Sequence, residues 1–491
     1  MRKNLLALSI AAMVGGLSGA ANAAVISDGG TATLLETTTT GVGHILVVPY
    51  FSTQANNKTL LNIVNTDTSN GKAVKLRFRG AANSDDIFDI TVYLSPGDVW
   101  TADVSADGDG FSHLVTDDNS CTLPSAAAIK ADDNGRFKTN RVQGQKDQTR
   151  EGYVEILNSA DIPPLTGAVA GTNSALYNAI KHVGKTAPCT TAVMDLQEND
   201  LADAAAAAAR GYSNPTGGLM ANWVLVNVNG FASHAGEAVA VRANDAAGVS
   251  AAGNIVWFPQ TTTTPTLASN LLTSDPLLQL GSFAGQVANY DFPDLSTPYF
   301  AAAAAGAPEA QAIALSNALG TTSVTNEYLT GNGFSTDWVF SMPTRRYAVA
   351  MDYAAPIATR LLFNGANTAH YTAANTTLSA DGFQACVTPG ALRGYGREEQ
   401  TQTTFVISPS AALRLCGEVS VLAFNNKNNA SVLDAKIARN DVTSIYNEGW
   451  MRIGTPARAG GSAFGLPIIG YAASKVSGAN LGGTWKHRTA R

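Results

Sequence analysis

The sequence predicts a mainly β fold made of antiparallel β-sandwich modules with short helical insertions. Short runs along the whole chain alternate apolar and polar side chains, which is the two-residue period of a strand with one buried face. Clusters of Gly, Asn, Asp and Pro separate these runs, as expected for turns between antiparallel strands. This arrangement favours sandwiches over a parallel α/β sheet.

The first 23 residues predict a secretory signal peptide. Arg2 and Lys3 precede an apolar run over 5–17, and Ala21 and Ala23 supply a small-residue cleavage site. The run is shorter than the roughly 20 apolar residues that a membrane helix needs, and no later stretch approaches that length. We therefore expect a mature chain from Ala24 that acts outside the cell, at the cell surface, without a transmembrane segment.

The net charge of the chain limits the classes of partner that we expect it to bind. The full chain has a formal net charge of −6, and removing the two cations of the signal peptide makes it about −8. An acidic chain with 14% charged residues gives no electrostatic footprint for nucleic acid, so we expect no nucleic acid as a partner. This charge is typical of proteins that stay soluble, bind divalent cations or meet an anionic surface through bridging cations.

Two low-complexity segments suggest the domain organisation. Residues 24–43, with a threonine run at 37–40, are expected to form a flexible N-terminal arm. Residues 261–270, with four threonines before Pro265, predict a linker between an N-terminal β-sandwich region over 44–260 and a C-terminal one over 271–491. The cationic end, 486–491, is a candidate for lattice or anionic-surface contacts, with a disordered terminus as the alternative.

The run 74–79 shows the strand pattern most clearly. Three apolar residues alternate there with Lys75, Arg77 and Arg79, which predicts one buried face and one face in water. Such strands suit sandwiches of the immunoglobulin-like kind. Further strands are predicted at 88–94, 99–101, 153–157, 223–228, 238–242, 255–258, 338–342, 405–408, 419–424, 450–453 and 468–472.

Tryptophans lie inside several of these strands. A carbohydrate platform is one interpretation of such aromatic residues, but an apolar strand favours core packing for Trp223, Trp257, Trp338 and Trp450.

Helices are expected only as insertions. Asn199 and Asp200 can cap a helix over 201–210 that Gly211 ends, and a second helix is predicted over 308–319 with Gly320 after it.

Four cysteines in an exported chain predict two disulfides among Cys121, Cys189, Cys386 and Cys416. Three pairings are possible, and joining Cys121 to Cys189 and Cys386 to Cys416 closes the shortest loops. Metal binding by these cysteines is the weaker alternative, because no Cys-x-x-Cys or histidine cluster accompanies them.

Aspartates in a glycine-rich loop predict a calcium site. Asp103, Asp107 and Asp109 stand at near-alternating positions, so three hard oxygen ligands can converge on one ion. Solvated turns rich in Asp, Asn and Gly are the alternative. Calcium is the only cofactor that we expect.

No motif for catalysis is present. The chain lacks Gly-x-Ser-x-Gly, His-Glu-x-x-His, the P-loop and the dinucleotide-binding motif. Its six histidines are scattered. We therefore expect no enzyme and no catalytic residue.

Several strand-and-turn stretches resemble secreted surface-layer (S-layer-like) proteins of Gram-negative, particularly β-proteobacterial, species. The stretches are HILVVPY (44–50), LNIVNT (61–66), RFRGA (77–81), LSPGDVW (94–100), DWVFSMPTRR (337–346) and GLPIIG (465–470). The resemblance implies a coat protein that assembles with itself, with calcium and lipopolysaccharide or other surface glycans as helpers.

The leading hypothesis is therefore a structural protein that forms a surface array on the bacterial outer membrane, through strand edges that meet between identical subunits. A secreted glycan-binding β-sandwich module is the first alternative, and a solvent-exposed tryptophan would distinguish it. An outer-membrane barrel and an extracellular hydrolase are the remaining alternatives.

Overall fold

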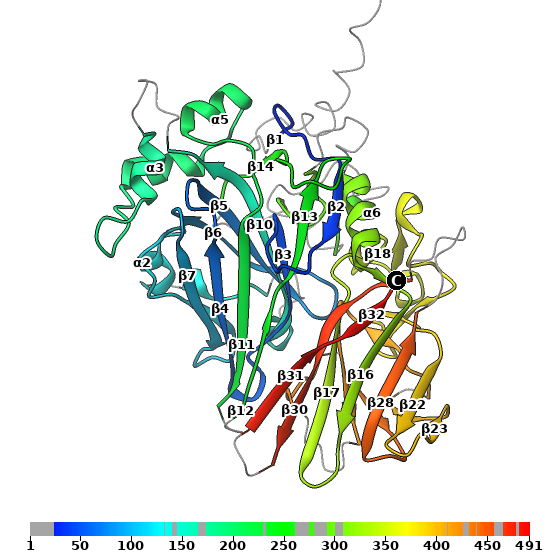
Figure 1. Ribbon diagram of the computed structural model, residues 1–491. Helices are drawn as coiled ribbons and strands as arrows, with labels where there is room; N and C mark the ends of the chain where they lie inside the picture. The colour runs from blue at the N-terminus through cyan, green and yellow to red at the C-terminus, as the bar shows by residue number, and fades with distance from the viewer. Residues whose placement is uncertain are drawn as a thin grey trace, which may run out of the picture.

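The computed structural model describes residues 24–131, 133–139, 145–164, 173–228, 232–260, 274–278, 292–299, 308–409, 411–425, 432–437, 439–455, 465–477 and 481–491. The chain is mainly β with several antiparallel sheets and few short helices, which confirms the predicted fold class. Two groups of strands stand side by side in Figure 1, the first drawn in blue to green and the second in green to red. The predicted signal peptide and the predicted linker at 261–270 lie outside the described residues.

Strands between Leu34 and Asn244 form the first sandwich, from one seven-stranded and one five-stranded sheet. In spatial order the larger sheet contains β2 (Leu34–Thr37), β13 (Val239–Asn244), β3 (Ile45–Ser52), β10 (Glu151–Ile162), β5 (Gly71–Gly80), β6 (Asp86–Leu94) and β9 (Cys121–Leu123). The smaller sheet contains β12 (Ala232–Glu237), β11 (Leu219–Asn227), β4 (Asn57–Asn65), β7 (Val99–Ala106) and β8 (Ser112–Val115).

Strands between Ser323 and Ala490 form the second pair of sheets. One has five strands, in the order β23 (Thr401–Gln402), β22 (Leu392–Gly396), β28 (Glu448–Gly454), β16 (Ser323–Leu329) and β32 (Arg488–Ala490). The other has six, in the order β24 (Val406–Ser408), β27 (Arg439–Thr443), β26 (Val419–Phe424), β17 (Phe334–Ser341), β30 (Ile469–Val476) and β31 (Leu481–Lys486). The β26–β27 pair is parallel.

Smaller elements complete the fold. The remaining strands are β1 (Ala24–Ile26) paired with β14 (Ile255–Trp257), β15 (Gly320–Thr321) with β29 (Leu466–Pro467), β18 (Val349–Met351) with β19 (Leu361–Phe363), and β20 (Thr376–Leu378) with β21 (Ala385–Val387), which also pairs with β25 (Leu415–Cys416). The helices are α2 (Ala126–Ala131), α3 (Ala175–Ile180), α4 (Thr191–Met194), α5 (Ala204–Arg210) and α6 (Pro308–Leu319). Short 3-10 turns are η1 (Gln54–Asn56), η2 (Asp133–Gly135), η3 (Lys146–Thr149), η4 (Asp195–Glu198), η6 (Pro276–Leu278), η10 (Arg345–Tyr347), η11 (Ile357–Thr359) and η12 (Gly365–Asn367).

Both predicted helices are present. Asp203 caps α5 by accepting a hydrogen bond from the Ala206 N–H, and Gly211 ends it with φ of 102°. The helix therefore starts three residues later than the cap at Asn199 and Asp200 implied.

The predicted flexible arm is instead part of the sheets. Its strands β1 and β2 pair with β14 and β13, and the side chains of Ala32 and Leu35 are buried. These apolar residues gain more from burial than the arm loses in chain entropy.

The cysteines pair as Cys121–Cys189 and Cys386–Cys416, the pairing with the shortest loops. Disulfides persist in oxidising compartments, so the bonds indicate a protein that works outside the cytosol. No helix in the described part of the chain is long and apolar enough to cross a membrane.

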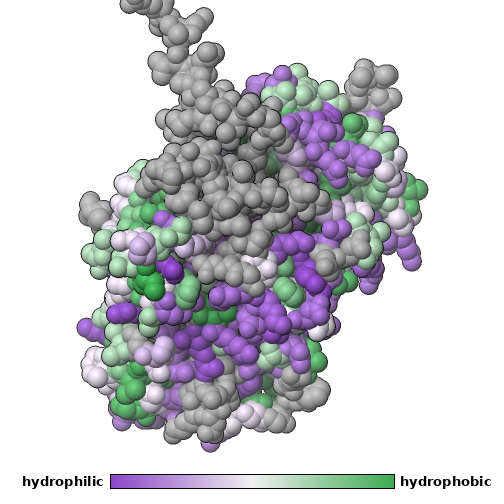
Figure 2. Space-filling model, turned by 180° about the vertical axis from the view of Figure 1, so that it is seen from behind, coloured by the Kyte–Doolittle hydropathy of each residue, from purple (hydrophilic) through white to green (hydrophobic). Residues whose placement is uncertain are grey.

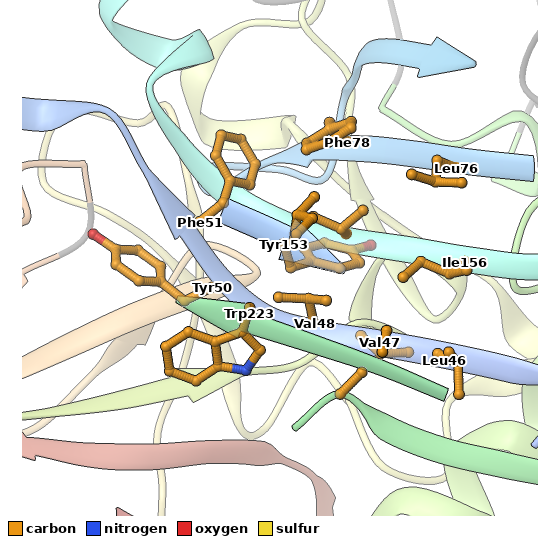
Figure 3. Close-up of a cluster of buried hydrophobic side chains, with 14 of the residues drawn as sticks. Leu46, Val47, Val48, Tyr50, Phe51, Leu76, Phe78, Tyr153, Ile156 and Trp223 are labelled. Atoms are coloured by element: carbon orange, nitrogen blue, oxygen red, sulfur yellow. The ribbon is translucent and has the colours of Figure 1, made fainter. Parts of the chain in front are cut away.

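The largest hydrophobic core extends from the first sandwich into the second. Figure 3 shows Tyr50, Phe78, Tyr153 and Trp223 among its members, and the Trp223 ring lies 4.5 Å from that of Tyr471 on β30. The edge strand β31 also lies against the edge strand β12 (Figure 1). The two sandwiches therefore share a core.

The basic face of β5 is buried, which corrects the prediction of a face in water. The side chains of Lys75, Arg77 and Arg79 are at most 4% exposed. Lys75 pairs with Asp89 and Arg77 pairs with Asp86. Alternation within one strand predicts two different faces, but it does not reveal that other parts of the chain cover the polar one.

Polar residues cover much of the face of the molecule that Figure 2 shows. Figure 2 shows a broad hydrophilic area across one face, with apolar residues in smaller groups around it. Single exposed apolar residues are ordinary on such a surface. A single exposed aromatic residue therefore does not mark a binding site unless neighbouring side chains form a site with it.

Candidate functional site

The outer face of the five-stranded sheet in the second sandwich carries a groove of about 850 Å³. The alternation of β16 and β28 sets up this face, because Val324, Tyr328, Met451 and Ile453 point into the second core. Their neighbours must then point outward. The groove is lined by Thr325, Asn326, Glu327, Leu329, Tyr395, Gly396, Arg397, Glu399, Glu448, Gly449, Trp450 and Arg488.

Two aromatic rings form the centre of the groove. Tyr395 on β22 and Trp450 on β28 are directly opposite in register, and their rings stack with centroids 4.0 Å apart and planes 10° apart. Trp450 remains 38% exposed. Offset or parallel stacking holds such rings in one orientation and leaves an amphipathic surface for a ligand.

The prediction that Trp450 packs in the core is wrong, whereas Trp223, Trp257 and Trp338 are buried as expected. The sequence pattern around Trp450 could have predicted this position. Trp450 alternates with Met451 and Ile453 and shares its side of the strand with Arg452, so the two-residue period predicts that Trp450 lies on the polar face of the strand.

A glycine allows the two strands of the aromatic pair to approach closely. A Cβ atom at Gly449 would lie 2.0 Å from the carbonyl oxygen of Tyr395. Any side chain at this position would push β22 and β28 apart and separate the rings.

Charged side chains flank the aromatic pair. Arg397 Nη1 lies 2.9 Å from Glu448 Oε2, and Arg488 Nη1 lies 3.8 Å from Glu327 Oε1. The Arg488 and Glu327 side chains are each 66% exposed. Pairs in this setting are weak and can exchange partners with a ligand.

A row of arginines crosses the sheet next to the aromatic pair. Arg393 on β22 stands opposite Arg452 on β28, Thr325 on β16 follows Arg452, and Arg488 on β32 follows Thr325. Arg393 and Arg452 are exposed, and neither has an ion pair with another described residue. Like charges directly opposite one another destabilise a sheet, so this row favours an anion in front of it.

The three predicted calcium ligands do not converge on one point, because each pairs with a basic side chain. Asp107 accepts hydrogen bonds from the Asp109 and Phe111 N–H groups of its own turn. Arg136 pairs with both Asp107 and Asp109 at 2.7 and 2.8 Å, and Asp103 lies 3.8 Å from Lys58. In the described part of the chain no group of three acidic, histidine or cysteine side chains could hold a metal. Calcium binding remains a prediction.

Comparison with protein-family models, with curated proteins and with solved structures gives no match in any of the three.

Proposed function

We propose that this protein is a secreted surface protein that binds a glycan through the groove centred on Tyr395 and Trp450. The observation that carries the proposal is the stacked, partly exposed aromatic pair on a rigid sheet. The apolar face of a sugar ring packs on an aromatic side chain, and nearby charged groups orient its hydroxyls. Glu327, Glu448 and Arg397 occupy those flanking positions.

The arginine row favours an acidic glycan over a neutral one. Guanidinium groups bind carboxylate and phosphate with two parallel hydrogen bonds. Arg393, Arg452 and Arg488 form a basic row on the surface of a chain with a net charge of −6. A polymer that carries anions and sugar rings would meet both features at once, as lipopolysaccharide and acidic polysaccharides do.

Binding is favoured over hydrolysis because of how the groove carboxylates are placed. The general acid of a glycosidase is usually a buried carboxyl group. The Glu327 side chain is instead 66% exposed, Glu448 is 28% exposed and pairs with Arg397, and Glu399 is exposed. Such carboxylates are suited to accepting hydrogen bonds from sugar hydroxyls.

The test is binding of the secreted chain to a panel of neutral and acidic glycans, including lipopolysaccharide. We expect Trp450→Ala to weaken binding by about tenfold or more, because it removes a partly buried ring at the centre of the contact. Trp485→Ala is the matched control, since Trp485 is 43% exposed on β31 and does not line the groove. Equal loss in both variants, or no glycan bound by the native chain, would rule the proposal out.

A second variant tests the charge of the ligand. The double substitution Arg393→Glu and Arg452→Glu should abolish binding to acidic glycans and leave any neutral glycan unaffected. Raised salt should act in the same direction, because exposed charges are screened.

The surface array remains a second candidate function, and one edge strand favours it. β24 is the outer strand of the six-stranded sheet. Its Val406 is 71% exposed, and nearby Ile445 is 72% exposed. An open edge with apolar side chains can pair with another copy. Electron microscopy of the native surface would test this, and a monodisperse monomer with and without calcium would contradict it.

A further inference from the structure

Three side chains form a compact group on the covered face of β5, with Lys75 and Gln260 buried and Asp89 partly buried. Lys75 Nζ lies 2.7 Å from Gln260 Oε1 and pairs with Asp89 on the adjacent strand β6. Gln260 Nε2 donates to the same carboxylate oxygen of Asp89 at 2.6 Å. An amine, a carboxamide and a carboxylate therefore all contact one another.

A fourth side chain contacts the carboxamide oxygen. Thr91 Oγ1 donates a hydrogen bond to Gln260 Oε1 at 3.0 Å. It therefore points a donor at the oxygen on which negative charge would develop if Lys75 attacked the Gln260 carbonyl carbon. Stabilisation of this oxygen is one requirement of an acyl-transfer reaction.

Burial favours the uncharged form of the Lys75 amine, which is the form that can act as a nucleophile. Desolvation lowers the pKa of Lys75, although Asp89 acts in the opposite direction. A lysine amine becomes a nucleophile when it loses its proton. Asp89 is placed to take that proton and pass it to the carboxamide nitrogen.

We propose that Lys75 and Gln260 join in an intramolecular isopeptide bond, with Asp89 as the proton carrier. Lys75 Nζ gives a proton to Asp89 and attacks the side-chain carbonyl carbon of Gln260, while Thr91 stabilises the oxygen. The carbon–nitrogen bond of the carboxamide then breaks. Both protons lost by Nζ pass to the departing nitrogen, which leaves as ammonium, and Asp89 ends as a carboxylate. No oxidant or cofactor is needed.

The bond would tie together distant parts of the chain. Its two residues are 185 positions apart. Lys75 lies in the middle of the seven-stranded sheet, and Gln260 follows β14 in the chain that leads to the second sandwich. A covalent link here would close a loop of 185 residues and so reduce the entropy of the unfolded chain.

The sharpest test is the intact mass of the purified, denatured native chain. Loss of one ammonia predicts a mass about 17 Da below that of the Lys75→Met variant, after correction for the substitution. Protease digestion should yield one branched peptide that joins Lys75 to Gln260, with no cleavage after Lys75. A full mass, or a linear peptide for each residue, would overturn the proposal even if the variant fails to fold.

Three variants separate the roles of the side chains. Asp89→Asn should abolish the loss of ammonia, so that this variant has its full calculated mass, because the proton carrier is gone. Thr91→Val should retain the crosslink and slow its formation. If instead Thr91→Val removes the mass loss and Lys75→Met retains it, the bond is an ester to Thr91 and the lysine proposal is wrong.

Lys72 supplies a matched control within the same strand. It is also buried and lies 2.8 Å from a carboxylate, that of Asp161, and its other hydrogen bonds go to Thr216. Lys72→Arg should therefore keep the mass loss. A branched peptide that starts at Lys72 would contradict the assignment to Lys75.

Discussion

Glu151 on β10 is a carboxyl group buried where the two sandwiches meet. Its Oε1 accepts hydrogen bonds from the N–H groups of Lys436 and Ile437, and Tyr50 donates to its Oε2. Burial nonetheless raises the pKa of Glu151 to about 7, because desolvation of the charged form outweighs those hydrogen bonds. The side chain therefore titrates near neutral pH.

This pKa predicts how stability changes with pH. The folded chain keeps the Glu151 proton up to about pH 7, whereas the unfolded chain loses it near the ordinary pKa of about 4.3. The contribution of Glu151 to the free energy of unfolding is thus largest at low pH and falls as pH rises between these values, by on the order of 3 kcal/mol in total.

Glu151→Gln removes the titration, keeps the shape of the side chain and keeps an oxygen that can accept from the Lys436 and Ile437 N–H groups. We expect the difference in unfolding free energy between variant and native protein to change steadily from pH 5 to pH 8 in urea titrations, with the variant gaining relative to the native chain. Parallel pH profiles for the two proteins would show that Glu151 stays charged in the folded state.

At the scale of elements, the disulfide between Cys121 and Cys189 fixes the helical insertion to the first sandwich. Cys121 lies in the edge strand β9, and Cys189 precedes α4, 68 residues later. The helices of this insertion stand at one end of the sandwich, away from the second one (Figure 1). An apolar cluster around Tyr93 and Trp257 also packs them against the sheet, and backbone hydrogen bonds join Ala187 to Asn119 and Ser213 to Asp161.

Replacing both cysteines with alanine should lower the free energy of unfolding by about 4 kcal/mol, because the unfolded chain regains the entropy of a long loop. Hydrogen exchange should increase most in α3, α4 and α5. The matched double variant at Cys386 and Cys416, which closes 30 residues, should leave exchange in these helices unchanged. Uniform acceleration over the first sandwich would contradict a local role for the bond.

At the scale of the whole molecule, buried ion pairs connect the two sandwiches. Arg346 in the second half pairs with Asp294 and lies 3.5 Å from Asp275. Asp294 also lies 3.6 Å from Arg79 on β5, and Arg79 lies 3.4 Å from Glu155 on β10. All five side chains are fully buried. Removing one charge would therefore leave its partners unpaired in a dry environment.

Arg346→Met should lower the free energy of unfolding by roughly 3–5 kcal/mol, the usual cost of breaking a buried pair. Arg397→Met is the control, because the Arg397 side chain is 69% exposed and an exposed pair contributes at most about 1 kcal/mol. Since the largest core contains residues of both halves, we also expect one cooperative transition by calorimetry. Two well-separated transitions in the native protein would contradict the shared core.

The sequence alone determined the local structure. Alternation located strands such as β5 and β28, glycine residues located the ends of α5 and α6, and loop length favoured the disulfide pairing that the structure has. Each of these features depends on neighbours in the chain, or on the length of chain between two residues, so the printed sequence contains the information.

Only the tertiary structure decided which residues pack against each face of a strand. Tyr395 and Trp450 are 55 positions apart in sequence, and they stack only because β22 and β28 became neighbours. The sequence pattern predicts that the basic face of β5 is exposed to solvent, yet Asp89, Gln260 and other distant residues cover it. A two-residue period separates the faces of a strand, but long-range packing decides which face is buried and which partners it meets.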